Sequence, residues 1–289
     1  MNYTSKLAED IEKEAKMVSD AYISCLFGSY TYNYLVYRYR EAASIYKSVQ
    51  EYLRAGECYF KAAESANKCR YRNKKELLEF NLQRALECYE LSYETTGVTN
   101  GSKREKIILG LITVFIENED FSRAGAMAFK LGDLYSQSGQ YPKAIDAYTK
   151  SSDFFYTEKN FEAMSIARFY TTQCYMILKK TTEAQNIFRK SIAIFKQNSY
   201  TSTIKAYIVI SYWIHLLTNG REEAKKLLNE YKDGLLDFRI KEIDEFIEQV
   251  DENYDTKDKS GIQDVLVCLL ELYREDFIKN YVKVILELM

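Results

Sequence analysis

Apolar residues recur every three or four positions through most of the chain, and short polar or glycine-bearing turns interrupt the pattern. This period predicts a series of amphipathic α-helices. The expected helices are 4–24, 34–49, 52–69, 74–94, 103–117, 121–138, 141–156, 161–178, 182–197, 202–218, 221–231, 239–253, 262–274 and 277–288. The one proline, Pro142, lies in the first turn of its expected helix, where no backbone donor is lost. The chain is therefore predicted to be all-α.

An internal repeat runs through this helical pattern. An alanine returns every 40 residues, at Ala144, Ala184 and Ala224. Four residues after each alanine stands a bulky apolar side chain: Tyr148, Phe188 and Leu228. Nine residues before each alanine stands a flat ring: Tyr135, Tyr175 and His215. A small residue facing a large one lets two antiparallel helices approach closely, which predicts tetratricopeptide-like helix pairs with more than the usual period of about 34 residues.

The repeat sets the expected architecture. We expect a tetratricopeptide-like right-handed superhelix of antiparallel helix pairs over residues 1–232. The regularity fades after Leu228, as it does in terminal repeats that must face water on one side. Residues 233–289 are therefore expected to form a C-terminal helical bundle.

Charge and cysteine usage exclude several classes of protein. The formal net charge of −2 gives no overall basic field for non-specific nucleic-acid binding. No stretch approaches the about 20 apolar residues of a membrane span, and the start of the chain has no apolar signal core, so a soluble, cytoplasmic protein is expected. The six cysteines occur singly, which favours reduced, buried thiols over a zinc site: Cys25, Cys58, Cys69, Cys88, Cys174 and Cys268.

Candidate chemistry is scarce. His215 is the only histidine, and it occupies the ring position of the repeat, so a packed side chain is favoured over a general base. We predict no catalytic residue, no metal, no cofactor and no small-molecule substrate. Aromatic and basic residues alternate only at 34–40 and 68–75, where solvated helix ends are favoured over nucleic-acid contacts. The acidic helix 239–253 is either a solvated face or a docking surface for a basic partner.

Several motifs resemble one family in their order and spacing. Leu26-Phe27-Gly28-Ser29 comes first, followed by Glu41-Ala42-Ala43-Ser44-Ile45-Tyr46, by Ala55-Gly56, and by Lys143-Ala144-Ile145-Asp146-Ala147-Tyr148. Together with Asp237, Arg239 and the acidic helix after them, these motifs resemble the soluble NSF attachment proteins (SNAPs) of the α-SNAP branch. The resemblance implies an adaptor that binds SNARE complexes and recruits an NSF-type AAA ATPase, so that the complex is taken apart after membrane fusion.

The resemblance also implies a membrane contact. The family's apolar membrane-touching loop corresponds to Ile23, Leu26 and Phe27, and the protein would be cytoplasmic and peripherally associated with membranes. Burying three such side chains is worth about 5 to 8 kcal/mol at most, before the cost of ordering the loop. Transient contact is therefore expected, without a permanent anchor.

Partner residues follow the family pattern in part. Lys47 matches a SNARE-contacting lysine of the family, while Arg123 and Arg168 lie near the positions where the resemblance expects two more. Those two positions hold Ala126 and Ser165.

For the ATPase, the resemblance implies Asp251, Glu252 and the penultimate Leu288, although the family's acidic tail is absent. The alternative is a scaffold of the same shape that binds another helical or peptide partner without ATPase coupling.

Overall fold

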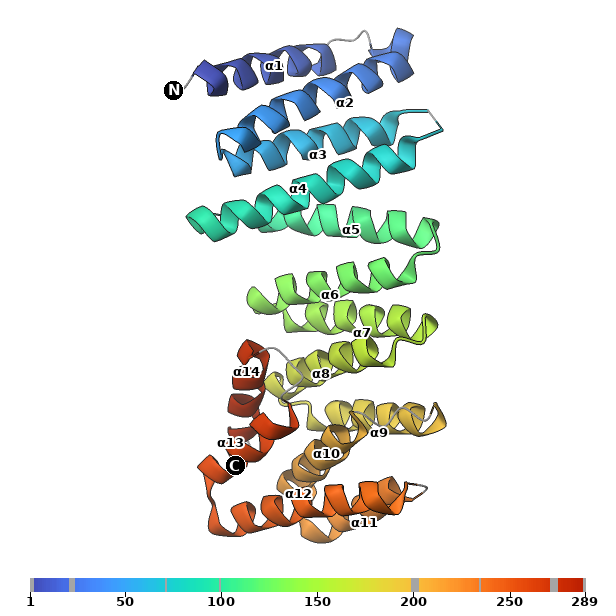
Figure 1. Ribbon diagram of the computed structural model, residues 1–289, viewed down its shortest axis with the longest axis vertical. Coiled ribbons are helices and arrows are strands. Elements are labelled where there is room, and N and C mark those ends of the chain that lie inside the picture. The colour runs from blue at the N-terminus through green and yellow to red at the C-terminus, as the bar shows by residue number, and fades with distance from the viewer. Residues whose placement is uncertain are drawn as a thin grey trace. The chain divides into compact units, whose positions relative to one another are not determined.

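The computed structural model describes residues 3–20, 24–70, 72–98, 100–198, 203–233, 235–270 and 275–287. Within these ranges every regular element is an α-helix (Figure 1). The helices are α1 (Tyr3–Asp20), α2 (Ser24–Ser48), α3 (Tyr52–Lys68), α4 (Lys74–Thr96), α5 (Gly101–Glu117), α6 (Phe121–Gln137), α7 (Tyr141–Thr157), α8 (Phe161–Ile177), α9 (Thr181–Gln197), α10 (Ile204–Asn219), α11 (Arg221–Lys232), α12 (Asp237–Thr256), α13 (Lys259–Leu269) and α14 (Glu275–Leu286). The predicted all-α class is confirmed.

The middle of the chain is built from a module of 20 residues. Helices α5 to α9 each contain 17 residues and begin at positions 101, 121, 141, 161 and 181. A left-handed residue lies in each of the first four turns between them: Glu119, Gly139, Lys159 and Lys179. Two such modules make up the 40-residue repeat, and the long helices account for its excess over the usual tetratricopeptide period.

The same hydrogen bond closes each of these turns. The amide of Gln140 donates to the Tyr135 carbonyl over 2.9 Å, and the amide of Lys180 donates to the Tyr175 carbonyl over the same distance. This bond ends a helix in the Schellman manner, with a left-handed residue next to it. The tyrosines that stand nine residues before Ala144 and Ala184, Tyr135 and Tyr175, therefore lie in the last turn of a helix and supply the carbonyl that closes the following turn.

The chain separates into two compact units, Met1–Leu134 and Tyr135–Met289. In the first unit each of the helices α1 to α4 packs against the helix that follows it in the chain (Figure 1). Small residues of α3, such as Ala55 and Ala62, are fully buried together with the ring of Tyr89 from α4. Gly56 also allows a close approach, because a Cβ atom added there would lie 3.3 Å from that ring. The small-against-large rule of the repeat thus holds in the first unit.

The second unit has an aromatic core. The three repeat alanines Ala144, Ala184 and Ala224 are completely buried there, as the repeat predicted. The ring of Tyr207 on α10 lies 4.2 Å from that of Phe169 on α8, and the rings of Phe188 and Phe195 on α9 surround it. Helix α14 returns to α8, where the Tyr281 hydroxyl lies 3.2 Å from the Thr172 hydroxyl. The expected boundary at residue 232 stays a prediction.

Two local expectations are corrected. Helix α2 begins at Ser24, whereas the sequence predicted that one helix ends at Ser24 and the next begins only at Tyr34. A glycine inside a helix costs only about 1 kcal/mol, so Gly28 is accommodated within the helix. Cys268, expected to be buried, is exposed on α13, while Cys58, Cys69, Cys88 and Cys174 are buried free thiols, as predicted.

Candidate functional site

Helix α4 carries a stripe of polar residues to which neighbouring helices contribute cations. Glu79, Gln83, Glu87 and Glu90 are spaced three or four residues apart, so they lie along one side of the helix. Each of the three glutamates forms an ion pair with a basic residue of α2 or α6: Lys47, Arg123 or Lys130. We call this surface, with Arg84 included, the even-helix face of the first unit.

Lys47, the first predicted SNARE-binding residue, lies in the last turn of α2. Its Nζ lies 2.6 Å from a carboxylate oxygen of Glu87, and Arg84 reaches the other oxygen over 2.8 Å. The hydrogen bond from Lys47 holds the pKa of the Glu87 carboxyl below its ordinary value, and the same bond raises the pKa of Lys47. Both side chains remain partly open to solvent, so this pair can exchange with a partner's carboxylate.

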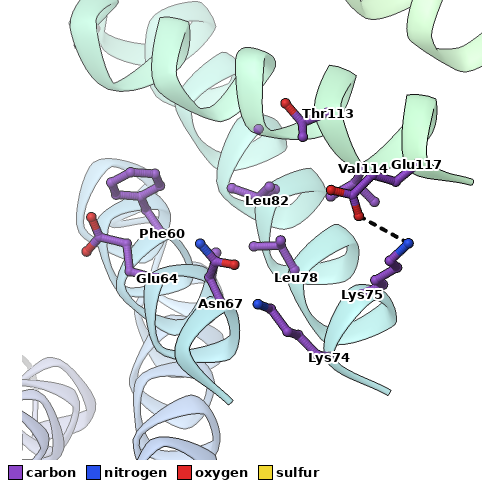
Figure 2. Close-up of a pocket in the computed structure, with 12 residues that line it drawn as sticks. Phe60, Glu64, Asn67, Lys74, Lys75, Leu78, Leu82, Thr113, Val114 and Glu117 are labelled. Atoms are coloured by element: carbon purple, nitrogen blue, oxygen red, sulfur yellow. Dashed lines mark ion pairs between the residues drawn. The ribbon is translucent and has the colours of Figure 1, made fainter. Parts of the chain in front are cut away.

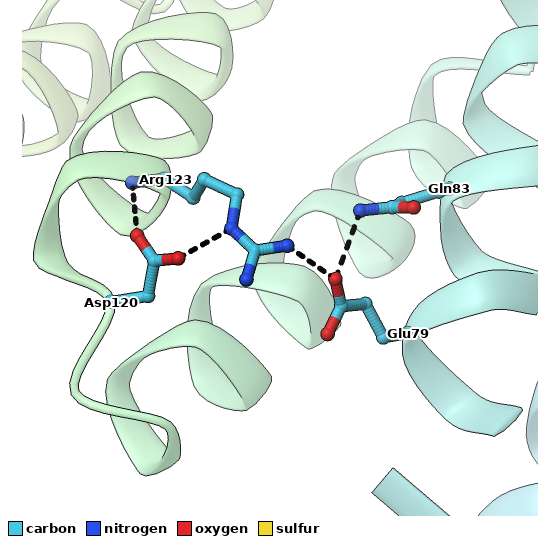
Figure 3. Close-up of polar contacts among 4 residues, drawn as sticks. All are labelled: Glu79, Gln83, Asp120 and Arg123. Carbon is cyan, nitrogen blue, oxygen red and sulfur yellow. Dashed lines mark hydrogen bonds and ion pairs between the residues drawn. The ribbon is translucent and has the colours of Figure 1, made fainter. Parts of the chain in front are cut away.

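Arg123, the second predicted residue, begins α6 and bridges to the same stripe (Figure 3). Its guanidinium lies 2.5 Å from Glu79 and 2.5 Å from Asp120, and its backbone amide donates to Asp120 as well. These bonds, the backbone one foremost, lower the pKa of the Asp120 carboxyl. The guanidinium also lies 4.4 Å from the centre of the Phe115 ring. The structure therefore places Lys47 and Arg123 on one acidic stripe, about 12 Å apart along α4 by helical rise.

Between these ion pairs lies a shallow pocket of about 220 Å³ with an apolar floor. Leu86, Leu111, Phe115 and Met127 line it, and Ala126 stands at its edge. Ala126 is the position where the resemblance expects a lysine. Lys130, one turn further along α6, lies 2.6 Å from Glu90 and also lines the pocket. The face thus combines an apolar floor with paired charges around it.

Arg168, the third predicted residue, lies in the second unit and is held differently. Its Nε donates to the Ser152 hydroxyl over 2.9 Å, and Nη1 donates to the Ser191 hydroxyl over 3.1 Å. Burial lowers the pKa of the Arg168 guanidinium. The negative charge of Asp153 partly opposes this shift. Ser165, where the resemblance expects a lysine, is completely buried. The structure does not join Arg168 to Lys47 and Arg123 in one described site.

The predicted ATPase-binding residues lie on α12 and beyond it. Asp251 accepts a hydrogen bond of 2.8 Å from the Tyr212 hydroxyl and lies 3.9 Å from Arg221, so its carboxylate faces its own unit. Glu252, the next residue, is exposed. Leu288 lies outside the described residues.

The predicted membrane-contact residues are described only in part. Ile23 lies outside the described residues. The backbone of Leu26 and Phe27 belongs to the first turn of α2, and their side chains are not described. Among the helices that the structure describes, none has the length and apolar character that crossing a membrane requires.

The described residues assemble no metal site. No group of three or more histidine, cysteine or acidic side chains could hold a metal ion there. His215 lies half-buried at the end of α10, and burial lowers the pKa of its imidazole. This placement agrees with the predicted packed ring.

The sequence did not identify two cations of the even-helix face or an aromatic ring beside it. Arg84 and Lys130 were missed, and so was Phe80 of α4, whose ring lies between Arg40 and Arg84 at 4.5 and 5.4 Å. A signal was available, because Lys47 and Glu87, like Glu90 and Lys130, are 40 residues apart. In both pairs, residues that are one 40-residue repeat apart face each other across alternate helices, from α2 to α4 and from α4 to α6.

These features define an all-α protein of consecutively packed helix pairs, with an exposed charged face that spans alternate helices. The chain belongs to the soluble NSF attachment protein (SNAP) family, whose family model matches residues 4–270. Members of this family are adaptor proteins without enzymatic activity. No curated protein matches the chain.

Solved structures are similar to this chain at low sequence identity. One is BtubC (BKLC) from P. vanneervenii, with 12% identity over 80% of this chain and 91% of that chain, at a TM-score of 0.41. Another is a putative kinesin light chain from Podosopora anserina with nearly identical TPR-like repeats. It has 13% identity over 67% of this chain and 92% of that chain, at a TM-score of 0.41.

Proposed function

We propose that this chain is a SNAP-type adaptor that binds SNARE complexes and recruits an NSF-type AAA ATPase to take them apart. The observation that carries the proposal is the family match over residues 4–270. The even-helix face supports it, because a surface with several cations and an apolar floor suits the acidic side of a helical bundle. The adaptor would act in the cytoplasm, with transient membrane contact through Ile23, Leu26 and Phe27.

The roles of the candidate residues differ within this proposal. Lys47 and Arg123 contact SNARE carboxylates after their bonds to Glu87 and Glu79 open. Arg168 organises α7, α8 and α9 through its two serine bonds, because a half-buried guanidinium bound in this way is costly to withdraw. At the other end, Glu252 offers an exposed carboxylate to the ATPase.

A reconstituted disassembly reaction tests the proposal. Purified SNARE bundle, labelled for energy transfer, is mixed with an NSF-type ATPase, ATP and the protein, and loss of transfer is followed. We expect disassembly that depends on both the protein and ATP. Absence of disassembly, with the bundle still bound, would instead select a scaffold without ATPase coupling.

Charge reversal then tests the face. Lys47→Glu with Arg123→Glu should weaken SNARE binding at least about tenfold at low salt, because like charges repel across an interface. The matched control is Lys61→Glu with Lys103→Glu, which changes the charge equally. Those two lysines pair with Glu12 and Glu57, each over 2.7 Å, across helices α1, α3 and α5. Equal loss in both double variants would remove the assignment to the even-helix face.

The second candidate, a scaffold for a different helical partner, is favoured by Ala126 and Ser165 at positions where the resemblance expects lysines. Under this alternative the protein would not support ATP-dependent disassembly of a SNARE bundle. A helical partner that carries both basic and acidic side chains would suit the face better than a purely acidic one. The cations of the face are already paired with glutamates of α4, so the face itself presents both signs of charge.

A further inference from the structure

The connection between α3 and α4 concentrates positive charge. Between Glu64 and Glu76 the chain carries five cations and no acid: Lys68, Arg70, Arg72, Lys74 and Lys75. We call these residues the basic corner. Lys74 is half-buried and the other four are exposed. Because α3 ends at Lys68 and α4 begins at Lys74, the cations lie at the tip of a helix pair.

Ion pairs with described residues balance only part of this charge. Lys75 forms an ion pair of 3.1 Å with Glu117, which Figure 2 shows at the end of the pocket between α3, α4 and α5. Among the described residues, however, no acid forms an ion pair with Lys68, Arg72 or Lys74. Lys68 instead lies 5.6 Å from the centre of the Tyr32 ring. Elsewhere in the unit, Lys47, Lys61, Lys103 and Lys130 are each paired within 2.7 Å.

The corner lies beside the beginning of α2. Helices α2 and α3 are packed neighbours that run in opposite directions, so the start of α2 and the end of α3 are at the same side of the unit (Figure 1). The contact between Lys68 of α3 and Tyr32 of α2 confirms that these two helix ends lie side by side. Tyr30, two residues earlier, is 79% exposed. Tyrosine next to lysine and arginine is the composition of a membrane interface, where ring and cation both meet lipid headgroups.

The shape of the corner distinguishes between anionic partners. A nucleic-acid strand is bound by a basic groove that follows its backbone, with aromatic side chains stacked on the bases. Here the cations are gathered at the tip of one turn, and α3 and α4 continue from it with the acids Glu64 and Glu76. Cations that are clustered at one tip can all contact a flat anionic surface at the same time. A strand that ran along either helix would meet carboxylates.

We propose that the basic corner binds the surface of membranes that contain anionic phospholipids. The inference extends the proposed membrane contact of the adaptor, and it adds an electrostatic component that the apolar residues do not supply. Each basic residue near an anionic surface multiplies the partition coefficient by about fivefold. Lys68, Arg72 and Lys74 together therefore contribute about 100-fold. This attraction is lost when salt screens the surface.

Vesicle binding tests the proposal. The full chain is sedimented with vesicles of phosphatidylcholine alone, and with vesicles that contain about one third phosphatidylserine, at low and high salt. We expect much stronger binding to the anionic vesicles at low salt. The variant Lys68→Gln with Arg72→Gln and Lys74→Gln should bind them about 100-fold more weakly.

A charge-matched variant is the control. Lys150→Gln with Lys159→Gln and Lys180→Gln removes three exposed lysines of the second unit and should bind the vesicles like the unchanged chain. Circular dichroism melting checks that both variants fold. Equal vesicle binding by the basic-corner variant and the unchanged chain would overturn the proposal, as would equal weakening by the control variant.

Two further readouts separate this inference from the proposed function. The basic-corner variant should bind a SNARE bundle in solution as tightly as the unchanged chain. If the unchanged chain disassembles SNARE complexes but ignores anionic vesicles, the proposed function stands and this inference fails. If it binds the vesicles through the corner but binds no SNARE bundle, the inference stands and the proposed function fails. Binding to single-stranded RNA in place of vesicles would also overturn it.

Discussion

The even-helix face of the first unit and the aromatic core of the second unit hold neighbouring helices together by different means. On the face, glutamates of α4 form ion pairs with Lys47, Arg123 and Lys130, all partly exposed. In the core, Tyr207 is completely buried among phenylalanine rings, and its hydroxyl donates to the Ser165 carbonyl over 2.7 Å. Exposed ion pairs contribute little stability, whereas buried rings contribute much.

This difference supports our proposal that the even-helix face is the surface that binds a partner. A pair in water can open and re-form with another carboxylate at small cost, so the face can exchange its internal acids for those of a bound protein. The second unit also holds cations, but Arg168 is bound to Ser152 and Ser191 in a half-buried position. Two arginines of similar appearance in the sequence, Arg123 and Arg168, therefore have different surroundings in the structure.

The largest expected effect lies in the core. Tyr207→Ala should destabilise the second unit by about 3 to 5 kcal/mol, because a large ring leaves a cavity among packed side chains. Tyr207→Phe keeps the ring and should cost only about 1 kcal/mol for the lost hydrogen bond. Urea unfolding followed by circular dichroism measures both. Similar losses from the two substitutions would contradict an aromatic origin of the stability.

The same type of turn occurs in both units, so substitutions there allow the two units to be compared directly. The expected effect on stability is smaller than in the core. Glu119 in the first unit and Lys159 in the second have φ angles of 57° and 56°, which favour glycine. Glu119→Gly and Lys159→Gly should each stabilise the chain by roughly 1 kcal/mol, and by similar amounts. Gly139→Ala, at a φ of 71°, should destabilise it by a similar amount. Thermal melts measure these changes. If Glu119→Gly and Lys159→Gly both destabilise the chain, the left-handed backbone at these turns is not strained.

The regular turn also shows how far the sequence could predict the fold. The buried alanines Ala144 and Ala184 were found because the sequence repeats them 40 residues apart. The underlying 20-residue module was missed, because lysine, glutamate and glycine fill the same left-handed position and share no side-chain property. Backbone conformation repeats there while residue type does not.

The candidate site could be predicted only in part. Lys47 and Arg123 were found through resemblance, but their partners Glu87 and Glu79 lie 40 and 44 residues away on another helix. Side-chain periodicity within a helix gives no information about pairs between helices. The partial burial of Arg168 could not be predicted either. An arginine that binds serine hydroxyls has the same sequence pattern as one that is solvated by water.

The ion pair itself should contribute little to folding. In a double-mutant cycle of Lys47→Met and Glu87→Gln, the coupling free energy should be about 0.2 to 1 kcal/mol and should fall as salt is added. Because the folded-state pKa of Glu87 is lowered, its contribution is present above the ordinary carboxyl pKa and lost as pH falls below it. Urea midpoints at neutral and acidic pH measure this. A coupling of several kcal/mol would mean that the pair is structural.

The smallest effect concerns His215. Burial lowers the pKa of its imidazole, Arg189 lowers it further, and Glu223 and Glu230 oppose the shift. The unfolded chain therefore binds the proton more readily, so stability is fully present above the ordinary histidine pKa and declines as pH falls through it. His215→Gln should flatten this slope in urea unfolding across mildly acidic pH. An unchanged slope would assign the pH dependence to other groups.

We propose that internal glutamates occupy the cations of the even-helix face until the carboxylates of a partner replace them. The direct test is the dissociation constant for a purified SNARE bundle, measured by titration calorimetry at low salt. Glu79→Gln with Glu87→Gln should tighten binding about fivefold, since two competing carboxylates are removed. Glu12→Gln with Glu57→Gln, which frees Lys61 and Lys103, is the charge-matched control. We expect tighter binding for the first variant alone; unchanged or weaker binding by it would mean that Glu79 and Glu87 do not compete with a partner for these cations.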